Sequence, residues 1–325
     1  MIFLVNESTD APYNLALEEL LASNFDEEIF MLWRNRNAVI VGRNQNTAAE
    51  VNADFVRANN IQVVRRMTGG GAVYHDLGNI NFTIVAKDRL LDSEAFARNA
   101  RPVLEALKNL NVPAEFSGRN DILADGRKIS GSAKTVLSDR TLFHGTLLFS
   151  ADLSMLGEVL TPDPEKIRAK GIKSVRSRVA NIREFLPQLD VEDFFAALKQ
   201  QLLCQTGAVE IAMPETLQMQ AEKLAETKYR TWQWNYGSNI NYSCSNKRYF
   251  SFGMVQASFN VKENCIADLM FNGDFFGSRD IGELCEALNG LNLEPAILTD
   301  AVGKLPIDRY INGASCADVV SLFML

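Results

Sequence analysis

The chain has 325 residues, of which 47% are apolar, enough to bury the core of one large domain or two ordinary ones. This composition excludes the disordered and collagen-like classes. With 40 acidic against 33 basic residues, the formal net charge of −7 argues against a dedicated nucleic-acid binder. The longest apolar stretches fall far short of the roughly 20 residues that a membrane helix needs. We therefore expect neither a nucleic-acid partner nor a membrane span.

The first residues and the cysteines indicate the compartment. Residues 1–6 form an apolar run of strand length without the basic flank or the small-residue cleavage site of a signal peptide, so we expect a cytoplasmic protein. The five cysteines are Cys204, Cys244, Cys265, Cys285 and Cys316. Their odd number and wide spacing argue against both a disulfide framework and a zinc site.

Helices and strands are predicted in an irregular order. Asp10 as N-cap and Pro12 in the first turn predict the start of a helix. The segments predicted after it are strands at 29–33, 38–41 and 61–65, a half-buried strand at 79–85, and helices at 101–110 and 191–203. Because helices and strands do not alternate regularly, we expect an α+β fold with a mainly antiparallel sheet rather than a doubly wound parallel sheet.

The stretch 237–246 is polar, uncharged and rich in turn formers, which predicts a linker and a domain boundary after residue 245. Beyond it we expect a hairpin formed by strands at 249–261 and 266–271. A change in the phase of the apolar residues near Gly253 predicts a β-bulge there. Two short helical patterns complete this smaller α+β part.

The segment 65–76 (RRMTGGGAVYHD) places three consecutive glycines after two arginines. Glycines let the backbone approach a ligand closely and direct N–H groups toward an anion, and the arginines add positive charge. The segment is not a Walker A loop, because no Gly-Lys-Ser/Thr follows at the required spacing. It is not a dinucleotide fingerprint either, because no helix follows. A mobile hairpin loop is the alternative interpretation of the glycines alone.

A second segment, 117–132, contains Asp125-Gly126 between extended runs, which predicts a two-residue hairpin. The register then sets Asp121 opposite Ser130 and places Lys128 on the same face as Asp121. These two residues are expected to be diagonal neighbours, with roughly 7–8 Å between their backbone positions. Such a gap can hold a phosphate with a metal ion on its carboxylate side. An exposed ion pair is the alternative.

The segment 165–184 carries 7 basic residues against 2 acidic ones in an otherwise acidic chain. This run is either a solvated face or a loop that folds over phosphates through residues such as Ser174 and Arg176. The chain has two histidines, His75 and His144, and both lie in or near predicted strands. Each is expected to be a hydrogen-bonded structural residue rather than a general base.

Taken together, these segments resemble the lipoate–protein ligase A family over almost the whole chain. The motifs that carry the resemblance, in family order, are NLALEE (14–19), GRNQN (42–46), RRMTGGGAVYHDLGN (65–79), SGRND (117–121), RKISGSAK (127–134), HGTLL (144–148) and KGIKSVRSRV (170–179). The resemblance implies a catalytic domain, residues 1–245, related in fold to biotin ligases and class II aminoacyl-tRNA synthetases. Residues 246–325 would then form a small accessory domain.

The resemblance also implies an activity. Enzymes of this family use ATP to convert lipoate to lipoyl-adenylate and transfer the lipoyl group to a specific lysine. Their acceptors are the lipoyl domains of 2-oxoacid dehydrogenases or the glycine-cleavage H protein. ATP and Mg²⁺ are expected as substrate and activator without a permanently bound cofactor, octanoate is an alternative acyl substrate, and the protein is expected to be a monomer.

Site residues are assigned by their positions in the motifs. Lys128 resembles the catalytic lysine that touches both nucleotide and lipoate, and Asp121 resembles the carboxylate near magnesium. The residues that match the ATP- or adenylate-binding set are Arg66, Gly70, Gly71, Ala72, Val73, Tyr74, Asn120, Lys128, Ser174 and Arg176. The residues that match the lipoate-binding set are Arg66, Gly71, His75 and Lys128.

Three rival interpretations remain to be weighed. An acyltransferase of the same fold passes its acyl group through a cysteine thioester, but this chain has no cysteine before Cys204. A biotin ligase would show a Gly-Arg-Gly-Arg-type loop where this chain has RRMTGGG. In a non-catalytic binder of acylated domains the motifs would be relics, yet Arg66, Asp121 and Lys128 are all present.

Overall fold

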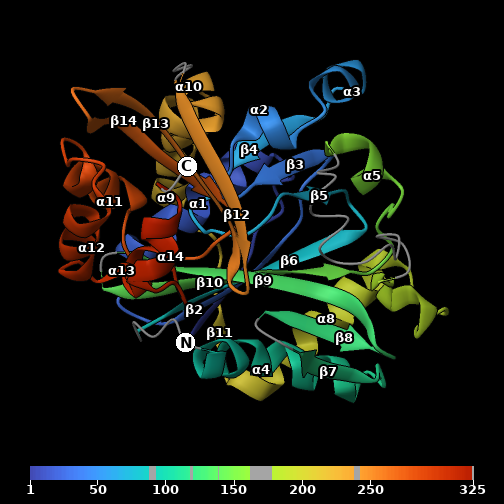
Figure 1. The fold of residues 1–325 in the computed structure, drawn as a ribbon. Helices are drawn as coiled ribbons and strands as arrows, with labels where there is room; N and C mark the ends of the chain where they lie inside the picture. The colour runs from blue at the N-terminus through green and yellow to red at the C-terminus, as the bar shows by residue number, and fades with distance from the viewer. Residues whose placement is uncertain (88–92, 118–119, 138, 162–177, 238–241, 324–325) are drawn as a thin grey trace.

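The structure is a computed structural model that describes residues 1–87, 93–117, 120–137, 139–161, 178–237 and 242–323 (Figure 1). Its largest sheet has eight strands in the order β11-β1-β2-β6-β10-β9-β8-β7. Their bounds are β1 Ile2–Val5, β2 Ile29–Trp33, β6 Asn79–Ala86, β7 Ala114–Ser117, β8 Asp121–Ala124, β9 Arg127–Leu137, β10 Arg140–Leu148 and β11 Val209–Glu210. Only β11 and β2 run parallel to their neighbour β1, so the expected mainly antiparallel sheet is confirmed.

Helices cover both faces of this sheet (Figure 1). The longer ones are α1 Ala11–Asn24, α4 Ser93–Asn109, α8 Val191–Thr206 and α9 Glu215–Leu224. On one face, Phe194 of α8 and Val103 of α4 pack in a core with Phe82 of β6. On the other, Leu15 of α1 packs in a second core with Val85 of β6. Strand β6 is therefore buried along its whole length, and the prediction of a half-buried strand is wrong.

A second, three-stranded sheet has the order β4-β3-β5. Its strands are β3 Ala38–Val41, β4 Gln62–Arg65 and β5 Val73–His75, and the glycine-rich segment joins β4 to β5. The short helices of this part of the chain are α2 Thr47–Glu50, α3 Ala53–Ala58, α5 Met155–Val159, η1 Ile182–Glu184, η2 Ala225–Tyr229 and α10 Trp232–Tyr236. Among the described residues, no helix is long and apolar enough to cross a bilayer.

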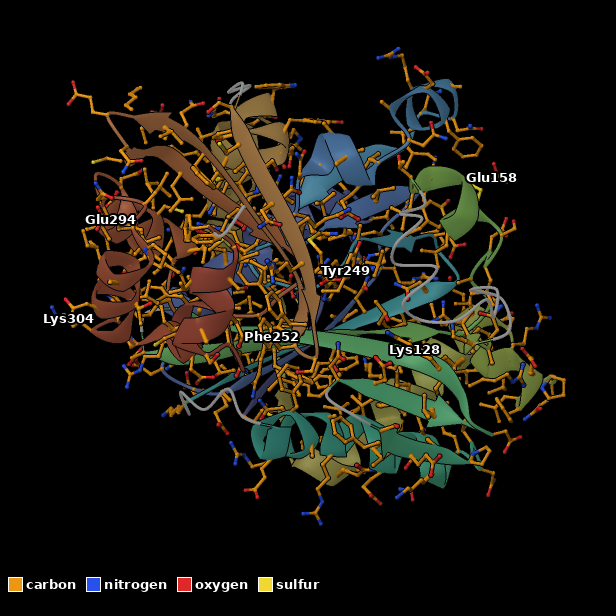
Figure 2. All side chains as sticks on the ribbon, viewed as in Figure 1. Lys128, Glu158, Tyr249, Phe252, Glu294 and Lys304 are labelled. Carbon is orange, nitrogen blue, oxygen red and sulfur yellow. The ribbon has the colours of Figure 1, made fainter. Side chains whose placement is uncertain are left out.

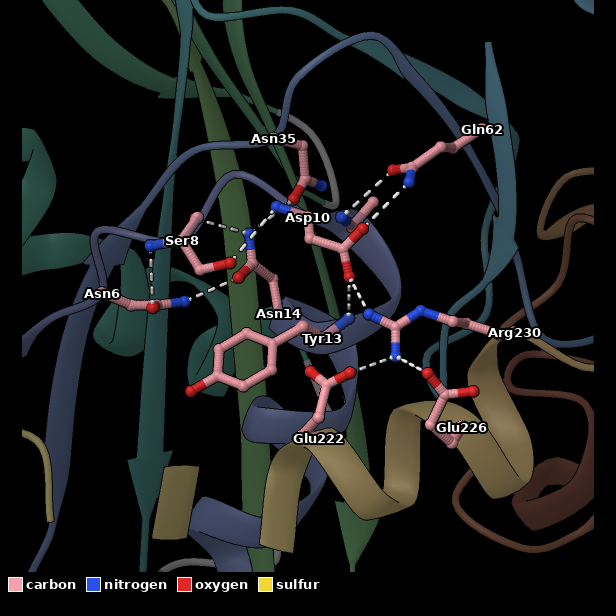
Figure 3. A network of polar contacts seen from close by, with 11 residues as sticks. Asn6, Ser8, Asp10, Tyr13, Asn14, Asn35, Gln62, Glu222, Glu226 and Arg230 are labelled. Carbon is pink, nitrogen blue, oxygen red and sulfur yellow. Dashed lines mark hydrogen bonds and ion pairs between the residues drawn. The ribbon is translucent and has the colours of Figure 1, made fainter. Parts of the chain in front are cut away.

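The start of α1 is fixed by a polar network (Figure 3). Asp10 is the N-cap, as predicted, and its Oδ2 accepts a hydrogen bond from the Tyr13 amide. Oδ2 also accepts from Arg230, at 2.7 Å, while Oδ1 accepts from Gln62 at 2.9 Å. One carboxylate thus ties α1 to β4 and to the residue after η2. Glu18 lies in the same helix, about two turns further on.

The C-terminal part contains a third sheet, β12 Cys244–Phe250, β13 Gly253–Lys262 and β14 Cys265–Gly273, which packs against helices α11 Ile281–Leu288, α12 Pro295–Gly303, α13 Ile307–Tyr310 and α14 Cys316–Ser321. Their apolar side chains form a separate core drawn from residues 252–323. This part contacts the rest of the protein through the Phe276 ring, which meets the Phe96 ring of α4 edge to face with 6.0 Å between the ring centroids.

Several sequence expectations about element limits are wrong. The single strand predicted at 249–261 is two strands, because the chain turns before Gly253, whose φ is +137°. The bulge lies between Ser258 and Asn260 instead, four helices follow where two were expected, and β12 begins inside the predicted linker 237–246. The helix predicted at 101–110 begins at Ser93. Burial of its apolar face offsets the cost of Pro102 in its interior.

Candidate active site

Arg66 holds the shape of the glycine-rich segment. Its side chain is only 5% exposed, and its Nε donates a hydrogen bond to Thr68 Oγ1 at 2.9 Å. Nη2 donates to the carbonyl oxygens of Gly69, at 2.7 Å, and Gly71, at 2.9 Å, and Nη1 donates to that of Ile40. Burial lowers the pKa of Arg66 to about 10, so the guanidinium keeps its charge at neutral pH. Arg66 therefore stabilises the glycine-rich segment from its buried side, through hydrogen bonds to the loop backbone.

The neighbouring Arg65 is also buried, and its guanidinium donates to backbone carbonyls that include those of Gly42, Gln45 and Asn235. Its contacts are all with the protein's own backbone or with Thr47, so it ties α10 to the turn after β3. Burial lowers the pKa of Arg65 to about 10. Arg65 therefore stabilises the backbone around the segment and keeps its positive charge there.

The segment is closed on one side and open on the other. Gly70 has φ +91°, a left-handed conformation that favours glycine, and a Cβ there would lie 3.0 Å from Arg66 Nη2 and 3.1 Å from the Phe276 ring. At Gly71 a Cβ would meet no described heavy atom within 4 Å. A ligand can therefore approach the backbone at Gly71, the position that the resemblance assigns to both substrates.

Residues 72–74 continue from the open glycine into β5. Ala72, Val73 and Tyr74 are all half-buried. Val73 packs against the core under α1, while Ala72 and Tyr74 pack on the opposite side of the small sheet. The Tyr74 hydroxyl donates to Asn37 Oδ1 at 2.9 Å. The side chains of these residues are thus held by packing and by the contact with Asn37.

His75 is 4% exposed and neutral. Burial, with smaller effects of Arg66 and His144, lowers the pKa of His75 to about 3. Asn35 Nδ2 lies 3.1 Å from Nδ1 of His75, so Nδ1 is the acceptor and Nε2 carries the proton. Within the described part of the chain, Nε2 has no hydrogen-bond partner. His75 is therefore hydrogen-bonded within the protein, as expected, but through Nδ1 alone.

Lys128 and Asp121 lie on the predicted hairpin, but in a different register. Leu123 is opposite Lys128, whereas Asp121 is opposite Gly131 rather than Ser130. The cause is a β-bulge that adds one residue to β9 after Lys128. The Asp125-Gly126 turn predicts the register next to the turn correctly. The bulge lies beyond that point and has no signal in the strand composition, so the register of Asp121 could not be predicted.

The bulge brings the two charges together. Lys128 Nζ lies 2.8 Å from Asp121 Oδ1, so the predicted gap is closed by an ion pair whose side chains are 36% and 34% exposed. A Cβ on Gly131 would lie 2.7 Å from Lys128 Nζ, so glycine makes room for the ammonium group on β9 (Figure 2). A partly exposed pair contributes at most about 1 kcal/mol. A phosphate can therefore displace Asp121 from Lys128 at small cost.

Asn120 supports this strand pair from the side. Its Nδ2 donates to the Ser132 carbonyl at 2.7 Å, and its own carbonyl accepts from the Ser132 amide at 2.8 Å. Ser174 and Arg176 lie outside the described residues, as does most of the basic segment 165–184. The end of that segment contacts the site, because the Ala180 amide donates to the Lys128 carbonyl at 2.9 Å.

A buried hydrogen-bond chain, missed from the sequence, connects Arg66 to the core. Glu18 is 2% exposed; its Oε1 accepts from Thr83 Oγ1 at 2.5 Å and lies 3.0 Å from His144 Nδ1. Nε2 of His144 lies 2.8 Å from Thr68 Oγ1, which accepts from Arg66. Both ring nitrogens of His144 are thus bonded, as predicted. Glu18 and His144 stand in quoted motifs, but only the fold brings residues 126 positions apart into contact.

The donor set also bears on magnesium. In the described part of the chain, no group of three or more His, Cys, Asp or Glu side chains could hold a metal ion. Asp121 therefore belongs to no such group among these residues. Mg²⁺ in nucleotide-dependent enzymes commonly takes one or two protein carboxylates and completes its octahedron with phosphate oxygens and water. A site that offers a carboxylate such as Asp121 is compatible with this mode.

Comparison with known families agrees with the geometry. The family described as "Lipoyl protein ligase A/B catalytic domain" matches residues 10–203, and the one described as "Bacterial lipoate protein ligase C-terminus" matches residues 239–323. The chain is 40% identical to Lipoate–protein ligase 1 of Staphylococcus aureus over 320 residues, which is 98% of each chain. The similarity therefore extends over nearly the whole length of both chains.

Solved structures give the same result. The crystal structure of P. falciparum LipL1 in complex with lipoate has a TM-score of 0.80 and 28% identity, covering 98% of each chain. A bipartite lipoate protein ligase from Thermoplasma acidophilum, described with its E2 lipoyl domain, has a TM-score of 0.66 and 31% identity over 75% of this chain and 98% of that chain. A lipoate-protein ligase A bound with ATP has a TM-score of 0.63 and 30% identity over 73% of this chain and 98% of that chain. The chain belongs to the lipoate–protein ligase family and is an ATP-dependent enzyme that ligates lipoate to acceptor proteins.

Proposed function

We propose that lipoyl-adenylate forms between the glycine-rich segment and the β8–β9 hairpin, with Lys128 as the catalytic residue. The observation that carries this proposal is the half-exposed Lys128 ammonium, which Gly131 accommodates and a single carboxylate holds. The backbone at residues 70–74 would bind the nucleotide, together with Asn120, Ser174 and Arg176. Arg66 contributes by fixing that backbone and by its buried positive charge.

The chemistry requires this charge. In the first step a carboxylate oxygen of lipoate attacks the α-phosphorus of ATP, the new O–P bond forms, and pyrophosphate leaves. Two anions must approach each other, and Lys128 screens their repulsion and stabilises the charge that develops on the phosphorus oxygens. In the second step the neutral amine of the acceptor lysine attacks the carbonyl carbon of the adenylate. An amide forms, AMP leaves with the electron pair of the broken C–O bond, and the amine nitrogen releases one proton to the solvent. No thiol of the enzyme takes part.

Two further groups assist. His75 presents a neutral Nε2–H that can donate to the lipoate carboxylate without needing a counter-charge. Asp121 would hold Mg²⁺ together with the phosphates, where the ion supplies charge neutralisation of ATP. Lys128 leaves Asp121 for the substrate when both substrates are bound, since an ion pair of this exposure is weak.

The same proposal includes the acceptor protein, the compartment and the domain organisation. The acceptor is a lipoyl domain of a 2-oxoacid dehydrogenase or the glycine-cleavage H protein, supported by the archaeal relative that is described with its E2 lipoyl domain. Octanoate is an alternative acyl substrate. The protein acts in the cytoplasm as a monomer, with residues 1–245 as catalytic domain and 246–325 as accessory domain; the separate apolar core of residues 252–323 supports this division.

The test uses the full-length protein and an apo lipoyl domain. With lipoate and magnesium-ATP, mass spectrometry is expected to show one lipoyl group on one lysine of the acceptor and none without ATP. Preformed lipoyl-AMP is expected to restore transfer in the absence of ATP, because the adenylate is the intermediate. Transfer from an acylated carrier protein without ATP, through a thioester on the enzyme, would instead identify an acyltransferase.

A further inference from the structure

Four polar side chains of β6 and β10 share one face of the large sheet, the face on which His144 contacts Thr68 of the glycine-rich segment: Asn81, Thr83, His144 and Thr146. The register pairs Thr83 with His144 and Asn81 with Thr146, and directly opposed residues of an antiparallel pair share a face. Each such pair forms one row across the two strands. In the row of Thr83 and His144 both side chains have a hydrogen-bond partner, because both bond to the buried Glu18. The next row, which contains Asn81, is different.

Asn81 is only 2% exposed, yet its amide is half used. Its Oδ1 accepts from Asn79 Nδ2 at 3.0 Å. Over the described ranges of the chain, Asn81 Nδ2 has no hydrogen-bond partner, and neither has Asn79 Oδ1. A buried amide donor without a partner destabilises a folded protein, and native proteins rarely leave one so. Such a donor points to an acceptor that arrives with a ligand.

The position of Asn81 relates it to the reacting groups. Its neighbour Thr146 contacts Gly131 on β9, because the Gly131 amide donates to Thr146 Oγ1 at 3.2 Å. Lys128 Nζ occupies the space over Gly131 where a side chain would otherwise lie. Asn81 is thus two strands from Lys128 in one row across the sheet, a separation of roughly 10 Å at the usual strand spacing.

The row also changes in polarity along its length. Trp33 of β2, which is 2% exposed, pairs with Asn81 on the side away from Lys128. Asp121 pairs with Gly131 at the other end. Asn81 therefore lies where an apolar environment gives way to the Lys128 and Asp121 ion pair. A ligand that spans this boundary has an apolar body and an anionic head.

We propose that Asn81 is a binding residue for the acyl substrate and that its Nδ2 donates a hydrogen bond to the carboxylate of lipoate. The proposal rests on the proposed role of Lys128 and adds to it the group that holds the attacking carboxylate from the apolar side. An unused donor requires an acceptor, and a carboxylate is the acceptor that Lys128 and the His75 Nε2–H also favour. Asn81 thus orients the nucleophile, while Lys128 screens its charge.

The test compares two buried asparagines. Asn81→Ala is expected to raise the KM for lipoate, and the Kd of lipoate measured by calorimetry, by about 10- to 100-fold, the range of one charge-assisted hydrogen bond. The KM for ATP is expected to stay within about twofold of the wild-type value. Asn81→Asp keeps the acceptor for Asn79 but replaces the donor with a carboxylate, so it is expected to weaken lipoate binding at least as much.

Asn14→Ala is the matched control. Asn14 is also fully buried, but its Nδ2 donates to three acceptors and its Oδ1 accepts from Asn6. Figure 3 shows the contacts with Asn6, Ser8 and Asn35. Asn14→Ala is therefore expected to lower stability in urea more than Asn81→Ala does and to leave the KM for lipoate unchanged. A structural role for Asn81 would instead give the two variants the same pattern.

The outcomes separate this inference from the proposed function. If both Asn81 variants bind lipoate as the wild type does, Asn81 Nδ2 meets a water molecule only and the inference is wrong. If Asn81→Asp folds and binds lipoate normally while Asn81→Ala fails to fold, the inference is wrong as well. Activity that survives in Lys128→Ala would contradict the proposed site itself, whatever the Asn81 variants show.

Discussion

Lys128 can occupy its position because Gly131 has no side chain. Gly131 lies opposite Asp121 across a bulged strand pair, and the Lys128 ammonium fills the space above it. The chain could have placed an alanine or serine in this strand with better intrinsic propensity. Glycine at this point is therefore explained by the close approach of a charged side chain rather than by the backbone, since its φ is not in the left-handed region.

This geometry predicts the effect of one methyl group. In Gly131→Ala the new Cβ would lie 2.7 Å from Lys128 Nζ, so the ammonium must move. A displacement of about 1 Å at a reacting group costs on the order of 100-fold in rate. We expect lipoate-dependent ATP–pyrophosphate exchange to fall by about 10- to 100-fold. Gly157→Ala, where a Cβ meets no described heavy atom within 4 Å, serves as control and is expected to match the wild type.

His75 predicts a specific dependence of stability on pH. Its folded pKa of about 3 lies below the usual value of about 6.5 in the unfolded chain. The unfolded state therefore binds more protons between these values, and stability falls as the pH is lowered from 7 toward 3. Between pH 7 and pH 5 the loss from this residue is about 2 kcal/mol. Urea unfolding of His75→Gln is expected to show a correspondingly smaller loss, and identical pH slopes in the two proteins would refute the assignment.

At the scale of elements, short sequence patterns correctly predicted the features that depend only on residues close together in the chain. Asp10 and Pro12 identified the start of α1 to the residue, and Asp125-Gly126 identified the turn between β8 and β9. The bulge in β9 and the division of residues 249–261 into two strands were not predicted, because both depend on pairing with a neighbouring strand. The early start of α4 was missed because tertiary burial outweighs the helix-breaking effect of Pro102.

The N-cap of α1 gives a prediction at this scale. Asp10→Ala removes the cap and the contacts with Gln62 and Arg230, which join α1 to two other segments. We expect the free energy of unfolding to fall by about 1–2 kcal/mol, with the KM for lipoate little changed, because the cap lies away from the site. In Asp300→Ala, which removes only an exposed ion pair with Lys304, stability is expected to change by less than about 0.5 kcal/mol. Equal losses in the two variants would contradict the role given to Asp10.

At the scale of the whole molecule, the C-terminal part packs on the glycine-rich segment. A Cβ on Gly69 would lie 2.3 Å from the Phe275 carbonyl oxygen, and Arg43 forms an ion pair with Asp280 at 2.8 Å. No pattern in the sequence relates residue 69 to residue 275, so this part of the site could not be predicted. The motifs that resemble the family suggested the candidate site residues; the contacts between them came only from the fold.

The distribution of thiols makes a prediction for the whole chain. All five cysteines lie after residue 203, and burial raises the pKa of Cys285 to about 11, which leaves its thiol unreactive. A variant with serine or alanine at all five positions is expected to keep most of its lipoyl transfer activity wherever it still folds. Circular dichroism checks the fold. A folded variant that has lost transfer, together with a trapped thioester in the wild type, would revive the acyltransferase mechanism.

The central claim is that Lys128 enables lipoate to form an adenylate, and lipoate-dependent ATP–pyrophosphate exchange tests it most directly. Lys128→Ala should fold normally, because its partly exposed ion pair contributes little to stability. Arg127→Ala, which removes a neighbouring exposed cation paired with Glu184, is the control and should exchange like the wild type. The account predicts that Lys128→Ala loses exchange by at least about 100-fold with its melting temperature intact. Exchange at the wild-type rate in folded Lys128→Ala would contradict it.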